Sequence, residues 1–528
     1  MAGLGLAFWE NGTPNEPVRP SSEAVKKGKK QYQCAVIATI MRSQRYGASS
    51  VTGFPPSPSQ RRTLAARASV SAILLFSLVG CSSVSVPDPE PLDLPEVFSD
   101  TQQPLPPVDW WITFNDDQLN QYVDAALSGN YSLKSAEARL AQSQASLRGS
   151  RSDYYPEVNA ELGKSRRWDG DDSTTDAWSA GLSASYEVDL WGSIRAGAAQ
   201  SAFAADASSA AYRTLANTVA GEITTYWLGL RVQSEKLRLL TDQKQRLETA
   251  LQVIEGRKRR GQAALTDVWQ QQKLVESLSV DIYEAEAQRD IYLQQLALWS
   301  GMGQSSLNSE MVGELEPITQ PDMTLNSVSL SALKSRPDVQ QAFYELQAAS
   351  AGVAVAAANR YPRFSLSASY SGSDTDLNNV FDNWVASLAG SLVLPLIDGA
   401  QRRAEVERQK ASEQEALANY SQTVLEAAQE VQQALVEEQR YQRTLKSLTD
   451  QLDLARKTLE LQDYYYARGQ IDFLDLLNAQ QELLSLESQH LAARWNLTQS
   501  RIQLYKAVSH GRFNDRLSNN DALGDADA

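Results

Sequence analysis

Two long tracts of helical periodicity dominate the chain, and each ends close to a glycine. Residues 194–260 and 401–468 contain no proline and carry apolar residues at spacings of three and four. This pattern predicts helices that, at about 1.5 Å per residue, each reach about 100 Å. Helices of that length do not fit inside a compact domain, so the chain is expected to be an extended, mainly α protein.

Each long tract is followed by a second helical tract with a coiled-coil seam, in which apolar residues recur at alternating steps of three and four. A glycine between the two tracts predicts a tight turn and an antiparallel hairpin. Two shorter helices are expected between residues 115 and 152, with a break at Gly129-Asn130. The two predicted seams are Val275, Leu278, Ile282, Ala285, Arg289, Tyr292, Leu296 and Trp299, and Leu477, Gln481, Leu484, Ser488, Leu491, Trp495, Thr498, Ile502 and Tyr505.

A period of two residues precedes each long helix. Residues 158–162, 178–190, 364–370 and 384–394 alternate apolar with small polar residues, which predicts four strands, the last of them ending at Pro395. An acidic loop, residues 169–176, separates the first two strands. Such strands are found in soluble sandwiches and in outer-membrane barrels, where one face meets lipid and the other meets water. Four strands cannot close a barrel, whereas three copies of the chain would supply twelve.

The two halves of the chain repeat one another. Pro362 and Trp384 follow Pro156 and Trp178 by 206 residues, and the segment 466–480 follows 258–272 by 208. The chain is therefore expected to be an internal duplication, with two residues inserted between these landmarks; the turn at Asp398-Gly399 is one place for them. We expect a first repeat over 109–320, a second over 321–510 and a flexible tail over 511–528.

The start of the chain resembles a bacterial lipoprotein signal. Arg61, Arg62 and Arg67 precede an apolar run that ends in Leu78-Val79-Gly80-Cys81. Residues 1–80 are thus expected to combine a mispredicted N-terminal extension with a lipoprotein signal peptide. Cys81 would carry the covalent lipid, and the proline-rich residues 81–108 would form a lipidated, extended tether.

Composition excludes several classes of function. The net charge is −15, and the first 80 residues hold ten Lys/Arg against three Asp/Glu, so the remainder is more acidic still. An acidic body disfavours nucleic acid as a partner. With two histidines and two cysteines in the whole chain, no metal site is predicted. No cluster of nucleophile, base and orienting group can be assembled, so we expect neither an enzyme nor a cofactor besides the lipid.

Several short motifs together resemble one known family. They are Trp110-Trp111-Ile112-Thr113-Phe114 with Asp117-Gln118-Leu119, Tyr155-Pro156, Tyr186-Glu187-Val188-Asp189-Leu190-Trp191-Gly192, Arg336-Pro337-Asp338-Val339, and Arg468-Gly469 followed by Leu474-Asp475-Leu476-Leu477-Asn478-Ala479-Gln480. Together with the lipoprotein signal that ends at Cys81, this set of motifs is similar to the outer-membrane factor (TolC-type) family. Within that family it resembles the lipoprotein branch of the NodT or OprM type. The resemblance covers about residues 105–510.

This resemblance implies a fold and a function. The fold would be mainly α with a small membrane β part: a duplicated unit of two strands and a long helical hairpin, forming as a homotrimer a 12-stranded β-barrel on a periplasmic α-helical barrel. The trimer would lie in the outer membrane of a Gram-negative bacterium. It would be the exit duct of a tripartite pump for small molecules such as drugs, with a periplasmic adaptor protein and an inner-membrane RND-type transporter as partners.

The resemblance also assigns roles at the two glycine turns. Six turn residues would contact the adaptor: Arg260, Gly261, Gln262, Arg468, Gly469 and Gln470. Asp475, Asn478 and Asp472 would form the periplasmic gate. Capping of the returning helix is the alternative role of Asp475. Two other functions stay open: an outer-membrane channel for type I protein secretion, and a non-conducting, lipid-anchored coiled-coil spacer or adhesin.

Overall fold

The computed structural model describes residues 107–168, 170, 174–303, 328 and 330–509. Cys81, the signal peptide, the tether up to residue 106 and the tail lie outside these residues, as do half of the acidic loop and most of the link between the repeats. Lipidation of Cys81, the signal peptide and the flexible tail therefore stay predictions.

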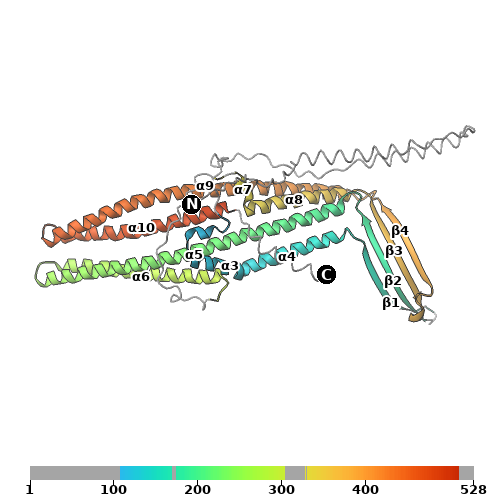
Figure 1. Ribbon diagram of the computed structural model, residues 1–528, viewed down its shortest axis with the longest axis horizontal. Coiled ribbons are helices and arrows are strands. Elements are labelled where there is room, and N and C mark those ends of the chain that lie inside the picture. Colours follow the sequence, from blue (N-terminus) through green and yellow to red (C-terminus); the bar gives the residue numbers. More distant parts are fainter. Residues whose placement is uncertain (1–106, 169, 171–173, 304–327, 329, 510–528) are drawn as a thin grey trace, which may run out of the picture. The chain divides into compact units, whose positions relative to one another are not determined.

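The described chain consists of two copies of one unit, drawn in Figure 1. Each copy has shorter helices, a strand pair and a long helical hairpin, in that order. The first copy comprises η1 (Trp110–Phe114), α3 (Asp117–Gly129), α4 (Tyr131–Ser152), β1 (Glu157–Trp168), β2 (Thr174–Val188), α5 (Ser193–Arg259) and α6 (Leu265–Trp299). The second comprises α7 (Leu330–Ser335), α8 (Pro337–Ala358), β3 (Arg363–Asp374), η3 (Leu377–Asn379), β4 (Trp384–Val393), α9 (Gln401–Ala467) and α10 (Phe473–Val508). The predicted fold class is confirmed.

The four strands form one antiparallel sheet in the order β1-β2-β3-β4. Glu157 lies opposite Ser185 in the first hairpin, and Arg363 lies opposite Val393 in the second. Because Arg363 follows Glu157 by 206 and Val393 follows Ser185 by 208, the two extra residues lie between β3 and β4. The expected place at Asp398-Gly399 is therefore wrong, and Ala386, not Trp384, takes the position of Trp178. The strand β2 also begins earlier than expected, so Asp176 pairs with Arg166 inside the sheet.

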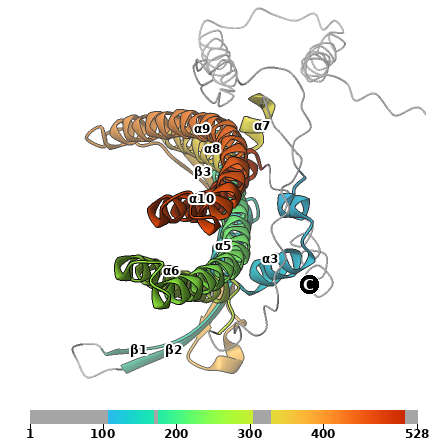
Figure 2. The same ribbon diagram turned by 90° about the vertical axis from the view of Figure 1, so that its left-hand side faces the viewer.

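The helices pack in a fixed sequence of neighbours. Toward the glycine turns, where each long helix lies beside its returning helix, α6 packs on α5, α5 on α10 and α10 on α9. This order can be followed in Figure 2. Nearer the sheet, α4 packs on α5, α5 on α8 and α8 on α9. The elements β1, α4 and α6 thus form one edge of the chain, and β4 and α9 form the other. None of the described helices combines the length and hydropathy of a membrane-spanning segment.

The coiled-coil seam of α6 is confirmed, whereas α10 differs from the prediction. α10 packs against α5 as well as α9, so it buries two stripes of residues. Gln481, expected in the seam, is exposed, and Leu483 and Leu486 are buried instead. A single seam cannot describe a helix with two neighbours, because each neighbour covers its own stripe.

The segment before α3 anchors the middle of the bundle. Trp110 is fully buried, and its indole donates to the Asn217 side chain of α5 at 3.0 Å. Asp116 caps α3 by accepting the N–H groups of Gln118 and Leu119, and it also accepts the indole N–H of Trp227 at 2.7 Å. These bonds satisfy a buried carboxylate and fix α3 against α5.

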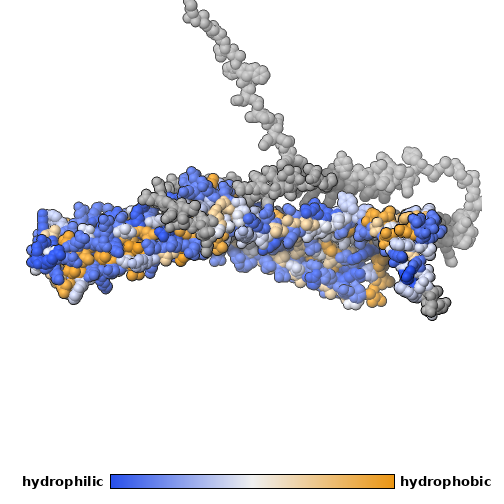
Figure 3. Space-filling view, turned by 90° about the horizontal axis from the view of Figure 1, so that it is seen from below, coloured by the Kyte–Doolittle hydropathy of each residue, from blue (hydrophilic) through white to orange (hydrophobic). Residues whose placement is uncertain are grey.

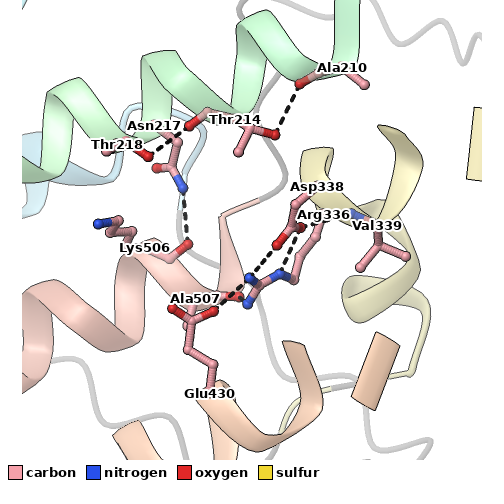
Figure 4. Close-up of polar contacts among 10 residues, drawn as sticks. All are labelled: Ala210, Thr214, Asn217, Thr218, Arg336, Asp338, Val339, Glu430, Lys506 and Ala507. Carbon is pink, nitrogen blue, oxygen red and sulfur yellow. Dashed lines mark hydrogen bonds and ion pairs between the residues drawn. The ribbon is translucent and has the colours of Figure 1, made fainter. Parts of the chain in front are cut away.

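The Arg336-Pro337-Asp338 motif opens α8, as its proline predicts. Figure 4 shows that the Arg336 guanidinium joins three helices: it contacts Asp338 at 2.7 Å, Glu430 of α9 at 2.6 Å and the carbonyl oxygen of Ala507 in α10 at 2.7 Å. Burial alone would lower the pKa of the Arg336 guanidinium. The carboxylates of Asp338 and Glu430 raise that pKa by more, so it lies above its usual value. The arginine is thus a charged tie between the second-repeat helices.

Each long helix begins after a residue in the left-handed region, and the two positions differ chemically. Gly192 precedes α5 with φ +81°, whereas Ala400 precedes α9 with φ +69°. The left-handed conformation costs a residue with a Cβ about 1 kcal/mol relative to glycine. We expect Ala400→Gly to raise the melting temperature of the purified protein and Gly192→Ala to lower it. A melting temperature that falls or stays unchanged in Ala400→Gly would overturn the assignment of strain to Ala400.

Candidate functional site at the hairpin tips

Both hairpins end in the same backbone turn. At the end of α5, Gln262 N–H donates to the Arg257 carbonyl and Gly261 N–H donates to the Lys258 carbonyl. At the end of α9, Gln470 and Gly469 make the equivalent bonds to Tyr465 and Tyr466. The glycines have φ of +74° and +70°. This is the Schellman arrangement, in which the last carbonyls of a helix are satisfied and the chain reverses.

The six residues expected to contact an adaptor are all exposed in these turns: Arg260, Gly261, Gln262, Arg468, Gly469 and Gln470. No side chain of the described residues lies within 4 Å of a Cβ added to either glycine, so glycine is needed there for its backbone conformation and not for space. The structure therefore brings each set of three residues to the outer end of a hairpin.

The three expected gate residues share one exposed face of α10. Asp472 is the N-cap position, and Asp475 and Asn478 follow at steps of three, so they lie on the same side of the first two turns. Their buried neighbours Phe473 and Leu477 point to the other side. The face that carries the two carboxylates is thus directed away from the hairpin core.

The two aspartates that open the returning helices behave differently. In the first repeat, the Asp267 carboxylate accepts the Ala264 N–H at 3.0 Å and caps α6. Within the described residues, its counterpart Asp475 makes no such bond, and the N-cap Asp472 accepts none from the helix. The hydrogen-bonded cap is therefore a property of the first repeat, whereas Asp475 can act on the helix start only through its charge.

A small apolar cluster holds the two tips together. Ile254 and Val268 of the first hairpin pack with Phe473 and Leu477 of the second. Tyr466 packs against this cluster. The Arg257 guanidinium lies 4.3 Å from the centre of the Tyr466 ring and also donates to the Tyr466 carbonyl at 3.4 Å. Sequence reasoning missed Arg257, because a basic residue in the last turn of a helix is ordinary and its partner lies 209 positions away.

The tips also differ in their chemistry. The first ends α5 with Arg257, Lys258 and Arg259 and is strongly cationic. The second ends α9 with a run of tyrosines, where the Arg468 guanidinium lies 3.7 Å from the centre of the Tyr464 ring. A cation held over an aromatic face is positioned and less mobile than a free arginine.

Farther from the tips, a polar cleft of about 620 Å³ lies between α5, α9 and α10. Glu487 is buried beside it and accepts from Gln243 and Arg246 of α5, each at 2.8 Å. Glu235 of α5 pairs with Arg494 of α10 at 2.6 Å. These charge-assisted bonds tie the second hairpin to the first, because α5 belongs to one and α10 to the other.

His490 lies in this cleft, 3.2 Å from the Thr449 hydroxyl. Desolvation and the positive charges of Arg494 and Arg456 lower the pKa of the imidazole, while Glu235 opposes them. Asp450, Asp453 and Glu487 complete the charged lining. Among the described residues, no group of three His, Cys, Asp or Glu side chains is placed to hold a metal ion.

The His490 environment generates a pH prediction. A lowered pKa means that the packed state binds fewer protons than the unfolded state, so the stability from neutral His490 is complete above the ordinary pKa of 6.5 and is lost as pH falls below it. We expect the melting temperature to fall between pH 7.5 and 5.5, and to fall less in His490→Gln. His510→Gln is the matched control. An equal fall in both variants would contradict the prediction.

The chain is similar in sequence to known outer-membrane proteins. The family model described as outer membrane efflux protein matches residues 122–302 and 328–510. The pyoverdine export outer membrane protein OpmQ of Pseudomonas aeruginosa is 30% identical over 425 residues, which cover 77% of this chain and 88% of the relative. The probable outer membrane lipoprotein SilC of Salmonella typhimurium is 25% identical over 462 residues, covering 84% and 98%.

Solved structures agree with the fold. The outer-membrane channel OprN matches with a TM-score of 0.72 and 25% identity over 81% of this chain and 99% of the other. The CmeC channel of Campylobacter jejuni matches with a TM-score of 0.73 and 20% identity, over 83% and 97%. The members so described are channels, and the hairpin turns and strand pairs lie within the matched ranges. The chain belongs to the outer membrane efflux protein family, whose members are outer-membrane channels of efflux systems.

Proposed function

We propose that three copies of this chain form the outer-membrane exit duct of a tripartite efflux pump for small molecules. The observation that carries the proposal is that one chain leaves both of its edges open. Among the described strands, β1 and β4 each lack a neighbour on one side, and an unpaired strand edge is not tolerated in lipid. A second and a third copy satisfy these edges when β4 of one chain pairs with β1 of the next.

The helical edges support the same arrangement. Exposed apolar side chains follow α6 on one edge and α9 on the other, and a rotation about one axis would bring them together. Figure 3 shows that apolar residues reach the surface along the helical part. On α6 they are Trp269, Val280, Tyr283, Ile291 and Leu298, and on α9 they are Leu425, Val436, Leu454 and Leu461.

The number three follows from the lumen. Two copies supply eight strands, whose interior is filled by side chains, whereas three supply twelve and leave room for water. Serines line one face of β3 at 365, 367, 369 and 371, and the other face carries Phe364, Leu366 and Tyr370. An outer-membrane barrel requires polar side chains toward its wet lumen and apolar side chains toward lipid, and the two faces of β3 meet this requirement.

The hairpin tips are the sites proposed for the partners. The six turn residues are exposed and their backbone is fixed, which suits docking of a periplasmic adaptor. The cationic end of α5 favours an acidic adaptor surface. In a trimer, Asp472 and Asp475 would form two rings of three carboxylates each, and cations bridging these carboxylates would hold the aperture closed.

Relatives favour small molecules as the cargo. OpmQ is named for pyoverdine export, and SrpC of Pseudomonas putida is named as a solvent efflux pump outer membrane protein. On this basis we infer an inner-membrane RND-type transporter as the third component, and a covalent lipid on Cys81. Type I protein secretion is the second candidate within the channel class, and no described residue favours it.

Single-channel recording tests the proposal. The purified protein in planar bilayers is expected to conduct in discrete steps, and Asp475→Asn is expected to raise the open fraction at least several-fold because it removes carboxylates through which bridging cations would hold the aperture closed. Asp267→Asn, at the matching first-repeat position, is the control and should lose stability without changing the open fraction. A protein that never conducts would support the spacer alternative. An unchanged open fraction in Asp475→Asn would leave that residue without a gating role.

Cross-linking tests the seam between copies. Within the chain, Ala184 lies opposite Ala368 where the first repeat meets the second. If neighbouring copies meet in the same way, the offsets of 208 and 206 place Leu392 opposite Leu162 of the next copy. A chain with Leu162→Cys and Leu392→Cys should form disulfide-linked trimers upon mild oxidation. Leu162→Cys with Leu388→Cys, four residues out of register, should not. Equal cross-linking of both pairs would contradict this register.

A further inference from the structure

The lipid-facing side of β1 changes character along its length. Near the helices it carries Val158, Ala160 and Leu162, and toward the far end the same face carries Lys164 and Arg166. Alternate residues of a strand share a face, so these two cations lie on the side that the apolar residues mark as outward. Both are exposed. A cation facing hydrocarbon is unfavourable, so a polar group must meet this end of the strand.

Aromatic side chains mark the depth of the two cations. Trp178 lies opposite Lys164 on β2, and Tyr370 and Trp384 occupy the same face of β3 and β4. Phe381 from the β3–β4 connection stacks on Tyr370, with 5.9 Å between ring centres. Aromatic residues gather where lipid hydrocarbon gives way to headgroups. Lys164 and Arg166 are therefore at the level of headgroups on the far side of the sheet from the helices.

Both cations make contacts within the chain, but only Arg166 forms an ion pair among the described residues. The Lys164 ammonium lies 4.9 Å from the centre of the Trp178 ring. Arg166 makes two bonds to the Asp176 carboxylate, at 2.5 and 2.6 Å. No carboxylate among the described residues is within ion-pairing distance of Lys164. Asp374 lies opposite Trp178 on the same face, so these four charged side chains sum to zero, and the charge left without an ion pair among the described residues is the Lys164 ammonium.

We propose that Lys164 and Arg166 form a binding site for a phosphate-bearing lipid headgroup of the outer leaflet. The inference rests on the proposed function, because it requires the apolar face of the sheet to meet lipid. In the register expected between copies, Lys164 lies opposite Gly390 of the next chain, and the absence of a side chain there leaves space beside the ammonium. The Trp178 ring, level with Lys164, packs against the upper ends of the acyl chains, while the two cations donate to phosphate oxygens.

Native mass spectrometry of the purified trimer with added lipopolysaccharide lipid A tests the site. We expect bound lipid A on the natural protein, at least tenfold less on Lys164→Gln with Arg166→Gln, and a smaller loss on Lys164→Gln alone. Arg167→Gln is the matched control, since Arg167 is the adjacent cation on the opposite face of the same strand. The double variant must keep its trimer and its conductance, which separates failure of this site from failure of the channel.

The lipid's phosphates are tested separately. Lipid A from which both phosphates have been removed should bind the natural protein no better than the double variant, and millimolar inorganic phosphate should not displace the intact lipid. Displacement by inorganic phosphate would mean a simple anion site and would overturn the lipid assignment. Retention that is unchanged in the double variant, or lost equally in Arg167→Gln, would also overturn it.

Discussion

The open edges of a single chain are the constraint on which the rest of the molecule depends. Among the described strands, β1 and β4 each have one edge with unpaired backbone groups. Such an edge is unstable in lipid, because hydrocarbon offers no partner for an N–H or a carbonyl. The helices share this incompleteness, since α6 and α9 each leave apolar side chains exposed along an edge. In the proposed trimer, one rotation would close the sheet and the helical layer together.

The internal duplication gives the chain two glycine turns that share a backbone conformation but differ in their surrounding side chains. The two glycine turns have the same hydrogen bonds and nearly the same φ, yet the residues around them have diverged. Asp267 caps its helix, and Asp475 does not. The first tip is cationic and the second is aromatic and acidic. Of the two returning helices, only α6 has a hydrogen-bonded side-chain cap among the described residues, which fits the proposal that the second hairpin is the part that moves.

Charged groups buried between helices give the bundle its specificity. Arg336 with Asp338 and Glu430, Glu487 with Gln243 and Arg246, and Asp116 with Trp227 each join elements far apart in sequence. An ion pair of this kind gains little net stability over apolar packing, yet a misaligned helix would leave a charge buried and unpaired, which is costly. Long helices with many small residues can slide past one another, and these ties select one alignment.

The sequence by itself determined the elements, because periodicity reports which residues share a face. The strand pairs, the long helices, the glycine turns and the break at Asn130 followed from spacing alone, and motifs identified the family. Sequence did not determine partners across distance. The register that moved the two-residue insertion to the β3–β4 connection, the second buried stripe of α10 that left Gln481 exposed, and the contact of Arg257 with Tyr466 depend on which elements lie side by side. Only the tertiary structure decides this, because neighbours in space are set by the sum of all packing contacts and not by any local pattern.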